Sequence, residues 1–156
     1  MDMSKEDDVI TAALGVKTLV PCTAMFFGSN FRFTSENLPH IDATKPLGGA
    51  AIGETDASMV PDVGKATIKI DSGSYSSMKP QDLAMTYLHE AVNARAIQQF
   101  TMWSGPGFKN GGISRNDRAK LGPMGRWPSK GQVHSGIKDP DIGNQFERCL
   151  NGLPLE

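Results

Sequence analysis

Three polar residues in an otherwise apolar segment form the part of the sequence best suited to chemistry. His89, Glu90 and Asn93 lie among residues that are mainly Leu, Ala, Val and Tyr. On a helix, His89 and Asn93 share one face at a spacing that lets two side chains bind one ion, and Glu90 is offset to lie beside a water on that ion. A histidine and a charged glutamate in a buried helix also need partners, and a metal would supply one. The spacing therefore predicts a metal site.

The run Leu88-His89-Glu90 resembles the start of the signature of the zincin metallopeptidases, which is His-Glu-x-x-His on a helix preceded by an edge strand. A strand expected at residues 66–71, followed by a helix at 80–100, has the same order. Asn93 stands at the position of the second histidine. A neutral amide oxygen is a poorer zinc ligand than an imidazole, so this departure predicts weaker zinc binding, an ion harder than zinc, or a vestigial site.

The resemblance implies that a second helix completes the metal site. Segment 139–147 resembles the downstream acidic helix of the glutamate-ligated zincins. Glu147 is then the third metal ligand beside His89 and Asn93, and Gly143, one turn earlier, allows the two helices to approach closely. Zn²⁺ is the implied cofactor, with another divalent ion or none as the alternatives.

The same resemblance implies metal-dependent hydrolysis of a peptide or protein substrate. The ion would polarise the scissile carbonyl and lower the pKa of its bound water towards about 7. Glu90 is the expected general base, which takes the proton from this water and passes it to the leaving amine. His134 is a second catalytic candidate, either as a donor to the tetrahedral oxyanion or as a further ligand.

The elements that must position these residues follow from periodicity. Residues 66–71 alternate apolar and polar, which predicts a half-buried strand, at an edge, whose polar face is offered to an extended peptide. Residues 80–100 have a broad apolar surface typical of a mostly buried helix. Asp139 and Pro140 begin a last helix that ends near Leu150, with Asn151-Gly152 as its C-cap.

The apolar residues in the rest of the chain are spaced less regularly. We expect a short helix at 9–16, a β-hairpin at 17–34 with its turn at Gly28-Ser29-Asn30, and a long loop at 35–65 with a short strand at 50–52. Residues 104–138 are rich in Gly and Pro, carry more basic than acidic side chains, and predict a long basic loop. Together these elements predict one α+β, zincin-like domain over residues 1–156, with a small mixed or antiparallel sheet.

Composition limits the partners and the compartment. The formal net charge of −1 gives no overall field that would attract nucleic acid. No run approaches the roughly 20 apolar residues that a membrane span needs, and the acidic start of the chain has no secretory signal. We expect a cytoplasmic protein, or one exported by a route without a signal peptide. The two cysteines, Cys22 and Cys149, stand near opposite ends and are read as reduced thiols.

Four interpretations stay open. The domain is an active peptidase, such as an effector or toxin domain with a delivery or neutralising partner, or an inactive zincin fold used for binding, as Asn93 indicates. A metal-free nuclease-like toxin would use His89, His134 and the basic loop. In the simplest alternative, His89-Glu90 is a structural pair, with Glu90 linked to the Arg95 region.

Overall fold

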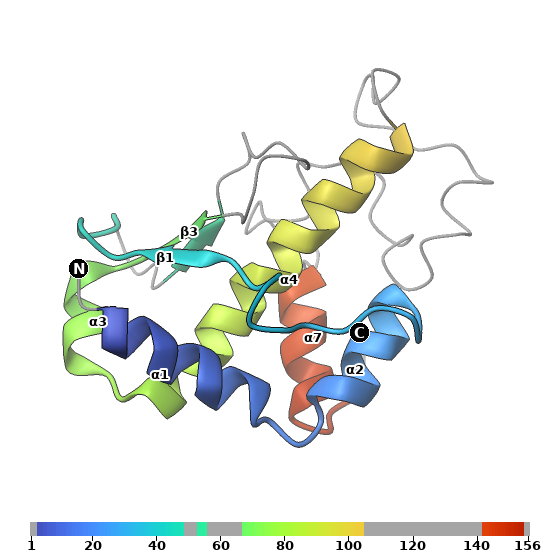
Figure 1. Cartoon of the computed structure of the whole chain (residues 1–156), viewed down its shortest axis with the longest axis horizontal. Coiled ribbons are helices and arrows are strands. Elements are labelled where there is room, and N and C mark those ends of the chain that lie inside the picture. The colour runs from blue at the N-terminus through green and yellow to red at the C-terminus, as the bar shows by residue number, and fades with distance from the viewer. Residues whose placement is uncertain (1–2, 49–52, 56–66, 105–141, 155–156) are drawn as a thin grey trace.

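The computed structural model describes residues 3–48, 53–55, 67–104 and 142–154, and for residues 3–4, 54–55, 96–104 and 142 it describes the backbone alone. The elements of this part are, in chain order, α1 (Met3–Leu14), α2 (Leu19–Phe27), β1 (His40–Asp42), β2 (Gly53–Thr55), β3 (Thr67–Ile70), α3 (Ser72–Ser77), α4 (Pro80–Ser104) and α7 (Ile142–Leu150). Figure 1 shows α4 running through the middle, with the sheet and α1 on one side and α7 and α2 on the other. The predicted α+β class and the small mixed sheet are confirmed.

The sheet has three described strands in the order β1-β3-β2. Strand β3 pairs in parallel with β1 and antiparallel with β2. Ile68 and Ile70 are fully buried whereas Thr67 and Lys69 are exposed, so the predicted half-buried strand is confirmed. Its predicted place at an edge is wrong, because β3 is central and has a partner on each side. Alternation reports which face of a strand is buried, and it carries no information about the two edges.

Residues 19–27 form a helix, so the predicted β-hairpin at 17–34 is wrong. The buried side chains of α2 are Leu19, Cys22, Thr23 and Phe26, whose spacing follows the helical period. Pro21 falls in the first helical turn, where its missing N–H is not needed. Gly28 ends the helix with a positive φ of 94°. The helical spacing of the apolar residues therefore outweighed the β propensity of the residue types in this segment.

Three further predictions differ from the structure. The helix expected at 9–16 forms, but α1 begins at Met3 and ends at Leu14. The loop expected at 35–65 contains β1 and β2, while the strand expected at 50–52 lies outside the described residues. Asp71, expected on the polar face of a strand, instead caps α3 by accepting a hydrogen bond from the N–H of Ser74 at 3.0 Å.

The core lies where α4 meets the sheet, α1 and α7. The face predicted for α4 is confirmed as far as Ala94, since Leu83, Tyr87, Leu88 and Val92 are all buried. The hydroxyl of Tyr87 donates to the carbonyl of Pro39 at 2.7 Å, which ties α4 to the start of β1. Burial, with a smaller contribution from the charge of Glu6, raises the pKa of Tyr87, so this hydroxyl stays protonated as a donor.

Glu6 makes the matching link from α1 to the sheet. It is 3% exposed, and its Oε1 accepts the N–H of Ile41 at 2.6 Å and lies 3.8 Å from Nδ1 of His40. This hydrogen bond gives a partner both to the buried carboxylate and to the backbone N–H of the strand. Helix α1 is therefore fixed to β1 by a polar contact as well as by apolar burial.

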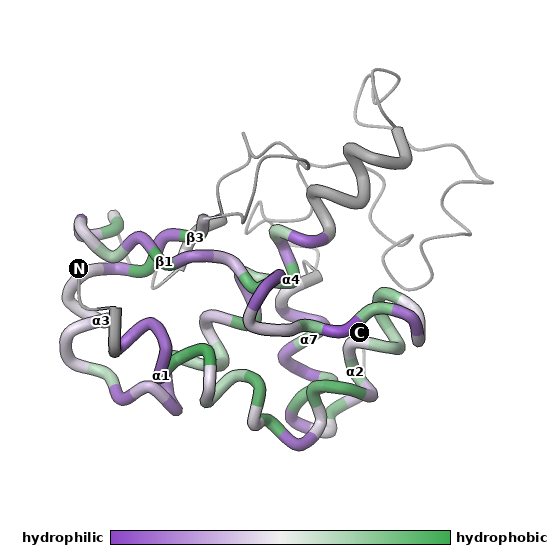
Figure 2. The backbone as a smooth tube through the Cα atoms, in the orientation of Figure 1, coloured by the Kyte–Doolittle hydropathy of each residue, from purple (hydrophilic) through white to green (hydrophobic). Residues whose placement is uncertain are grey.

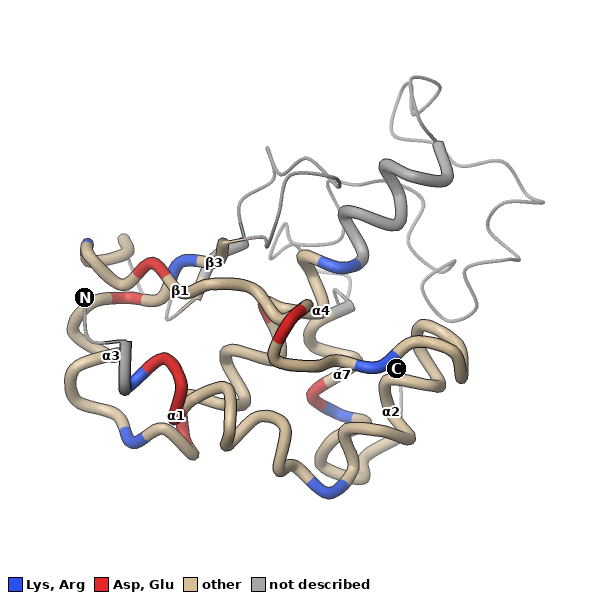
Figure 3. The backbone as a smooth tube through the Cα atoms, viewed as in Figure 1, with Lys and Arg blue, Asp and Glu red and all other residues tan. Residues whose placement is uncertain are grey.

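Within the described part of the chain, no single helix is long and apolar enough to cross a membrane. Helix α2 is the most apolar of these helices (Figure 2), and with α1 it reaches the required length only as a pair bent by 79°. Helix α1 carries a short acidic stretch, whereas α2 and α3 carry no charged residue (Figure 3).

Candidate active site

The contact between α4 and α7 brings His89 to Glu147, although the two residues are 58 positions apart in the sequence. Nδ1 of His89 lies 3.4 Å from Oε1 of Glu147. The side chain of His89 is 17% exposed and that of Glu147 is 35% exposed, so solvent reaches the pair mainly from the side of Glu147. The structure thus places two of the three predicted metal ligands next to each other.

Glu90 lies on the other side of the imidazole. Its Oε2 is 4.0 Å from Nε2 of His89, and its side chain is 8% exposed. Each ring nitrogen of His89 therefore faces a carboxylate oxygen, one from its own helix and one from α7. An imidazole held between two carboxylates can accept, hold and pass on a proton, or use a ring nitrogen as a metal ligand.

The backbone of two glycines, Gly143 and Gly53, lies directly against the side chains of His89 and Glu90. A Cβ atom at Gly143 would lie 2.7 Å from both Cδ2 and Nε2 of His89 and 2.8 Å from Cγ. Because these three distances are nearly equal, Gly143 lies over the face of the ring. A Cβ at Gly53 would lie 2.9 Å from Cγ of Glu90, so strand β2 lies directly against that side chain.

Asn93, the third predicted ligand, is buried and contacts α7. Its Oδ1 accepts the backbone N–H of Gly143 at 2.9 Å, and 1% of the residue is exposed. The oxygen that would serve as the metal ligand is thus used as a hydrogen-bond acceptor. His134 and the basic loop, apart from Ser104 at the end of α4, lie outside the described residues, as do Asp139 and Pro140 at the predicted start of the last helix.

Helix α7 is also fixed at its C-terminal end. The hydroxyl of Thr18 donates to the carbonyl of Leu150 at 2.6 Å. Gly152 has a φ of 73°, its N–H donates to the carbonyl of Cys149, and the N–H of Leu153 donates to that of Arg148, which confirms the predicted C-cap. These contacts fix the turn of helix that carries Glu147.

A disulfide joins α7 to α2. Cys22 and Cys149 are bonded, with their Cα atoms 5.9 Å apart, so the prediction of two reduced thiols is wrong. The sequence interval of 127 residues gave no indication of the bond, because the fold returns α7 to the side of α2 (Figure 1). Cys149 is two residues beyond Glu147, so the covalent link lies close to the candidate site.

An aromatic cluster fills the space between α2, α7 and the segment that follows α2. Phe146 packs edge-on against Phe26, with ring centroids 5.2 Å apart, and also contacts Phe33. The guanidinium carbon of Arg95 lies 4.2 Å from the ring centroid of Phe31. The Nε atom of Arg95 is buried and has no hydrogen-bond partner in the described part of the protein. Burial lowers the pKa of Arg95. No motif in the sequence signalled this arginine on an aromatic surface.

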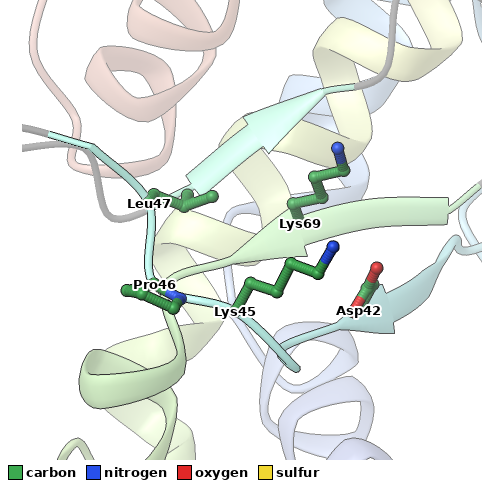
Figure 4. Close-up of a pocket in the computed structure, with 5 residues that line it drawn as sticks. All are labelled: Asp42, Lys45, Pro46, Leu47 and Lys69. Atoms are coloured by element: carbon green, nitrogen blue, oxygen red, sulfur yellow. The ribbon is translucent and has the colours of Figure 1, made fainter.

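A separate hollow of about 190 Å³ lies on the sheet, away from His89. Lys45 and Lys69 extend in the same direction beside Asp42, and Leu47 and Pro46 form the other end (Figure 4). Hydrogen bonds from Thr44 hold the pKa of Asp42 below its ordinary value. The residues that line the hollow include charged side chains but neither histidine nor cysteine, and we assign the hollow no catalytic role.

Comparison of the chain with known protein families, with curated proteins and with solved structures found no match. The geometry of the described residues is therefore the basis for assigning a function.

Proposed function

We propose that the chain is a zincin-like domain that hydrolyses peptide bonds at a metal site built on His89, Glu90 and Glu147. The observation that carries this proposal is the 3.4 Å approach of Glu147 to His89, because it joins the motif helix to a downstream acidic helix in the order that the resemblance implies. The strand before the motif helix is present as β3, and a glutamate beside the histidine is present as Glu90.

The donor set fits a divalent ion in part. An imidazole and a carboxylate are both ordinary ligands of catalytic zinc, so His89 and Glu147 would hold the ion. Asn93, in its hydrogen bond to Gly143, does not add a third donor, and no group of three or more His, Cys, Asp or Glu among the described residues is arranged to hold a metal. His134 stays a predicted further ligand or donor. When bound, the ion would polarise the scissile carbonyl and lower the pKa of a water.

The remaining roles belong to side chains of the chain itself. Glu90 would accept a proton from the attacking water and deliver it to the leaving amine. Its neighbour Gly53 excludes bulk solvent from one side of the carboxylate.

We also propose that the protein works in an oxidising compartment, since disulfides persist there and are rare in the cytosol. The Cys22–Cys149 bond favours the exported alternative over the cytoplasmic one. An effector or toxin role, with a partner that delivers or neutralises the domain, is the proposal that follows.

The test measures metal content and peptidase activity together. Protein purified without chelator, then dialysed against zinc, is analysed for bound metal and assayed on a quenched-fluorescent peptide library. We expect about one ion per chain in the wild type, loss of the ion in His89→Ala and Glu147→Gln, and retained ion without turnover in Glu90→Gln. Asp8→Asn, which removes an exposed carboxylate on α1, is the control that should change neither quantity. A wild type that takes up no zinc would overturn the proposal.

A second candidate function is a catalytically inactive zincin fold used for binding. The hydrogen bond from Gly143 to Asn93 favours it, because it commits the residue at the second ligand position to the contact between helices. A protein that binds one ion but cleaves no peptide, with His89→Ala still folded, would select this candidate over the peptidase.

A further inference from the structure

Asn93 meets α7 at a point where a helix needs an acceptor. Gly143 is the second residue of α7, and the first four N–H groups of a helix have no partner within it. Oδ1 of Asn93 accepts this N–H at 2.9 Å in a buried position. The acceptor has to be the amide oxygen, because the amide nitrogen has no lone pair to offer. Asn93 therefore caps α7 from a neighbouring helix.

The same contact sets how α7 lies along α4. His89 and Asn93 are four residues apart on α4, and Glu147 and Gly143 are four residues apart on α7. His89 faces Glu147 while Asn93 faces Gly143, so the two pairs oppose each other in antiparallel register. Gly143 also lies over the ring of His89. A shift of α7 by one residue would break all of these contacts together.

We infer that Asn93 is a positioning residue, which fixes the register of α7 and thereby holds the carboxylate of Glu147 at Nδ1 of His89. The catalytic meaning of this role rests on the proposed function. In this chain a hydrogen bond between protein groups does what a shared ion would otherwise do, which is to hold the motif helix and the acidic helix together. Asn93 is then no metal ligand, and the first turn of α7 is ordered without an ion.

The first test measures hydrogen exchange of the Gly143 amide in metal-free protein by nuclear magnetic resonance. Asn93→Leu removes the acceptor with little change of volume, and we expect exchange at Gly143 to become faster by about tenfold to a hundredfold, the equivalent of one lost buried hydrogen bond. Asn93→Asp keeps an oxygen at the same place and should restore protection. Val92→Ala, which removes buried volume from the neighbouring position on α4, should leave Gly143 protected relative to the rest of α7.

The second readout is specific to positioning. Ring nitrogen chemical shifts of His89 report whether Nδ1 still faces a carboxylate. We expect Asn93→Leu to shift them in the same direction as Glu147→Gln, and the double variant to add nothing to Glu147→Gln alone. Asn93→Asp should return them towards the wild type. If Asn93→Leu fails to fold, Asn93→Ala replaces it, since it removes the acceptor without adding an apolar branch.

Unchanged exchange at Gly143, or His89 shifts that respond to Glu147→Gln but not to loss of the Asn93 acceptor, would overturn the inference. Neither readout uses metal or turnover. If Asn93→Leu changes both the exchange at Gly143 and the His89 shifts, but the wild type binds no zinc, the inference stands and the proposed peptidase is excluded. If the wild type binds zinc and cleaves peptide, but Asn93→Leu changes neither readout, the proposed peptidase stands and the inference is wrong.

Discussion

The backbone of Gly143 lies over the imidazole face of His89, so close that a Cβ atom there would stand 2.7 Å from the ring. The contact joins the second residue of α7 to the motif histidine of α4, and it is possible only for glycine. Sequence reasoning placed this glycine on the side of α7 that faces α4, and its position over the ring is what the fold adds.

Gly143→Ala should therefore destabilise the protein by about 1–3 kcal/mol, the usual cost of extra volume in a filled site. The gain in helix propensity, about 1 kcal/mol, offsets part of this. Gly48→Ala is the matched control, because a Cβ there meets no described atom within 4 Å. Urea unfolding of both variants measures the difference, and equal midpoints would contradict the contact.

Reduction of the Cys22–Cys149 disulfide should lower the free energy of unfolding by about 5 kcal/mol, because the bond closes a loop of 127 residues in the unfolded chain. Unfolding is followed with and without reductant. The double variant Cys22→Ala/Cys149→Ala serves as the control, since reductant should not change its midpoint. Identical curves for oxidised and reduced wild type would mean that the bond is absent in solution.

Asp71 should make stability fall at acid pH. Its carboxylate accepts the N–H of Leu47 at 2.8 Å and that of Ser74 at 3.0 Å, and these bonds hold its pKa below the ordinary value of 3.8. A carboxylate with a lowered folded pKa stabilises the protein above pH 3.8 and loses that effect as the pH falls through the folded pKa.

In Asp71→Asn the contribution of this carboxylate to the pH dependence of the free energy of unfolding should disappear. The wild type should be the more stable protein at pH 7, and the gap should narrow between pH 4 and pH 2. Urea midpoints across this range provide the measurement. A gap that is constant with pH would show that the charge of Asp71 is irrelevant to its role as the cap of α3.

Arg95→Leu should change stability by less than about 1 kcal/mol. Removing the guanidinium relieves the cost of burying a charge whose Nε has no described hydrogen-bond partner, and it forfeits a cation–π contact of similar size with Phe31. The exposed Arg32, changed to Leu, is the reference. A loss above about 2 kcal/mol at position 95 alone would reveal an anionic partner of Arg95.

The sequence predicted best those parts of the fold that depend on interactions between residues close together in the chain. The positions of α4 and of the end of α7 followed from helical spacing and from Gly152, because the forces involved act within a few residues. The approach of Glu147 to His89 was expected through the resemblance, which supplied long-range information that periodicity lacks.

Other contacts had no local signal. Gly53 lies against Glu90 across an interval of 37 residues, and Gly53 itself falls in the stretch 35–65, where the sequence shows little periodicity. In α2 the residue types favoured strand, and only the spacing of the buried positions indicated helix. Asn93 was read as a ligand because the motif drew attention to its place on α4, while its true neighbour, the first turn of α7, is known only from the fold.

The bond between Cys22 and Cys149 also changes what a protease could do to the molecule. The backbone from residue 22 to residue 149 becomes part of a closed covalent ring, which contains α4 and all of α7 except its last residue. A single peptide-bond cleavage inside the ring opens it without dividing the molecule, so His89 and Glu147 stay on one covalent assembly. Separation of the two pieces then requires a reductant as well as the cut.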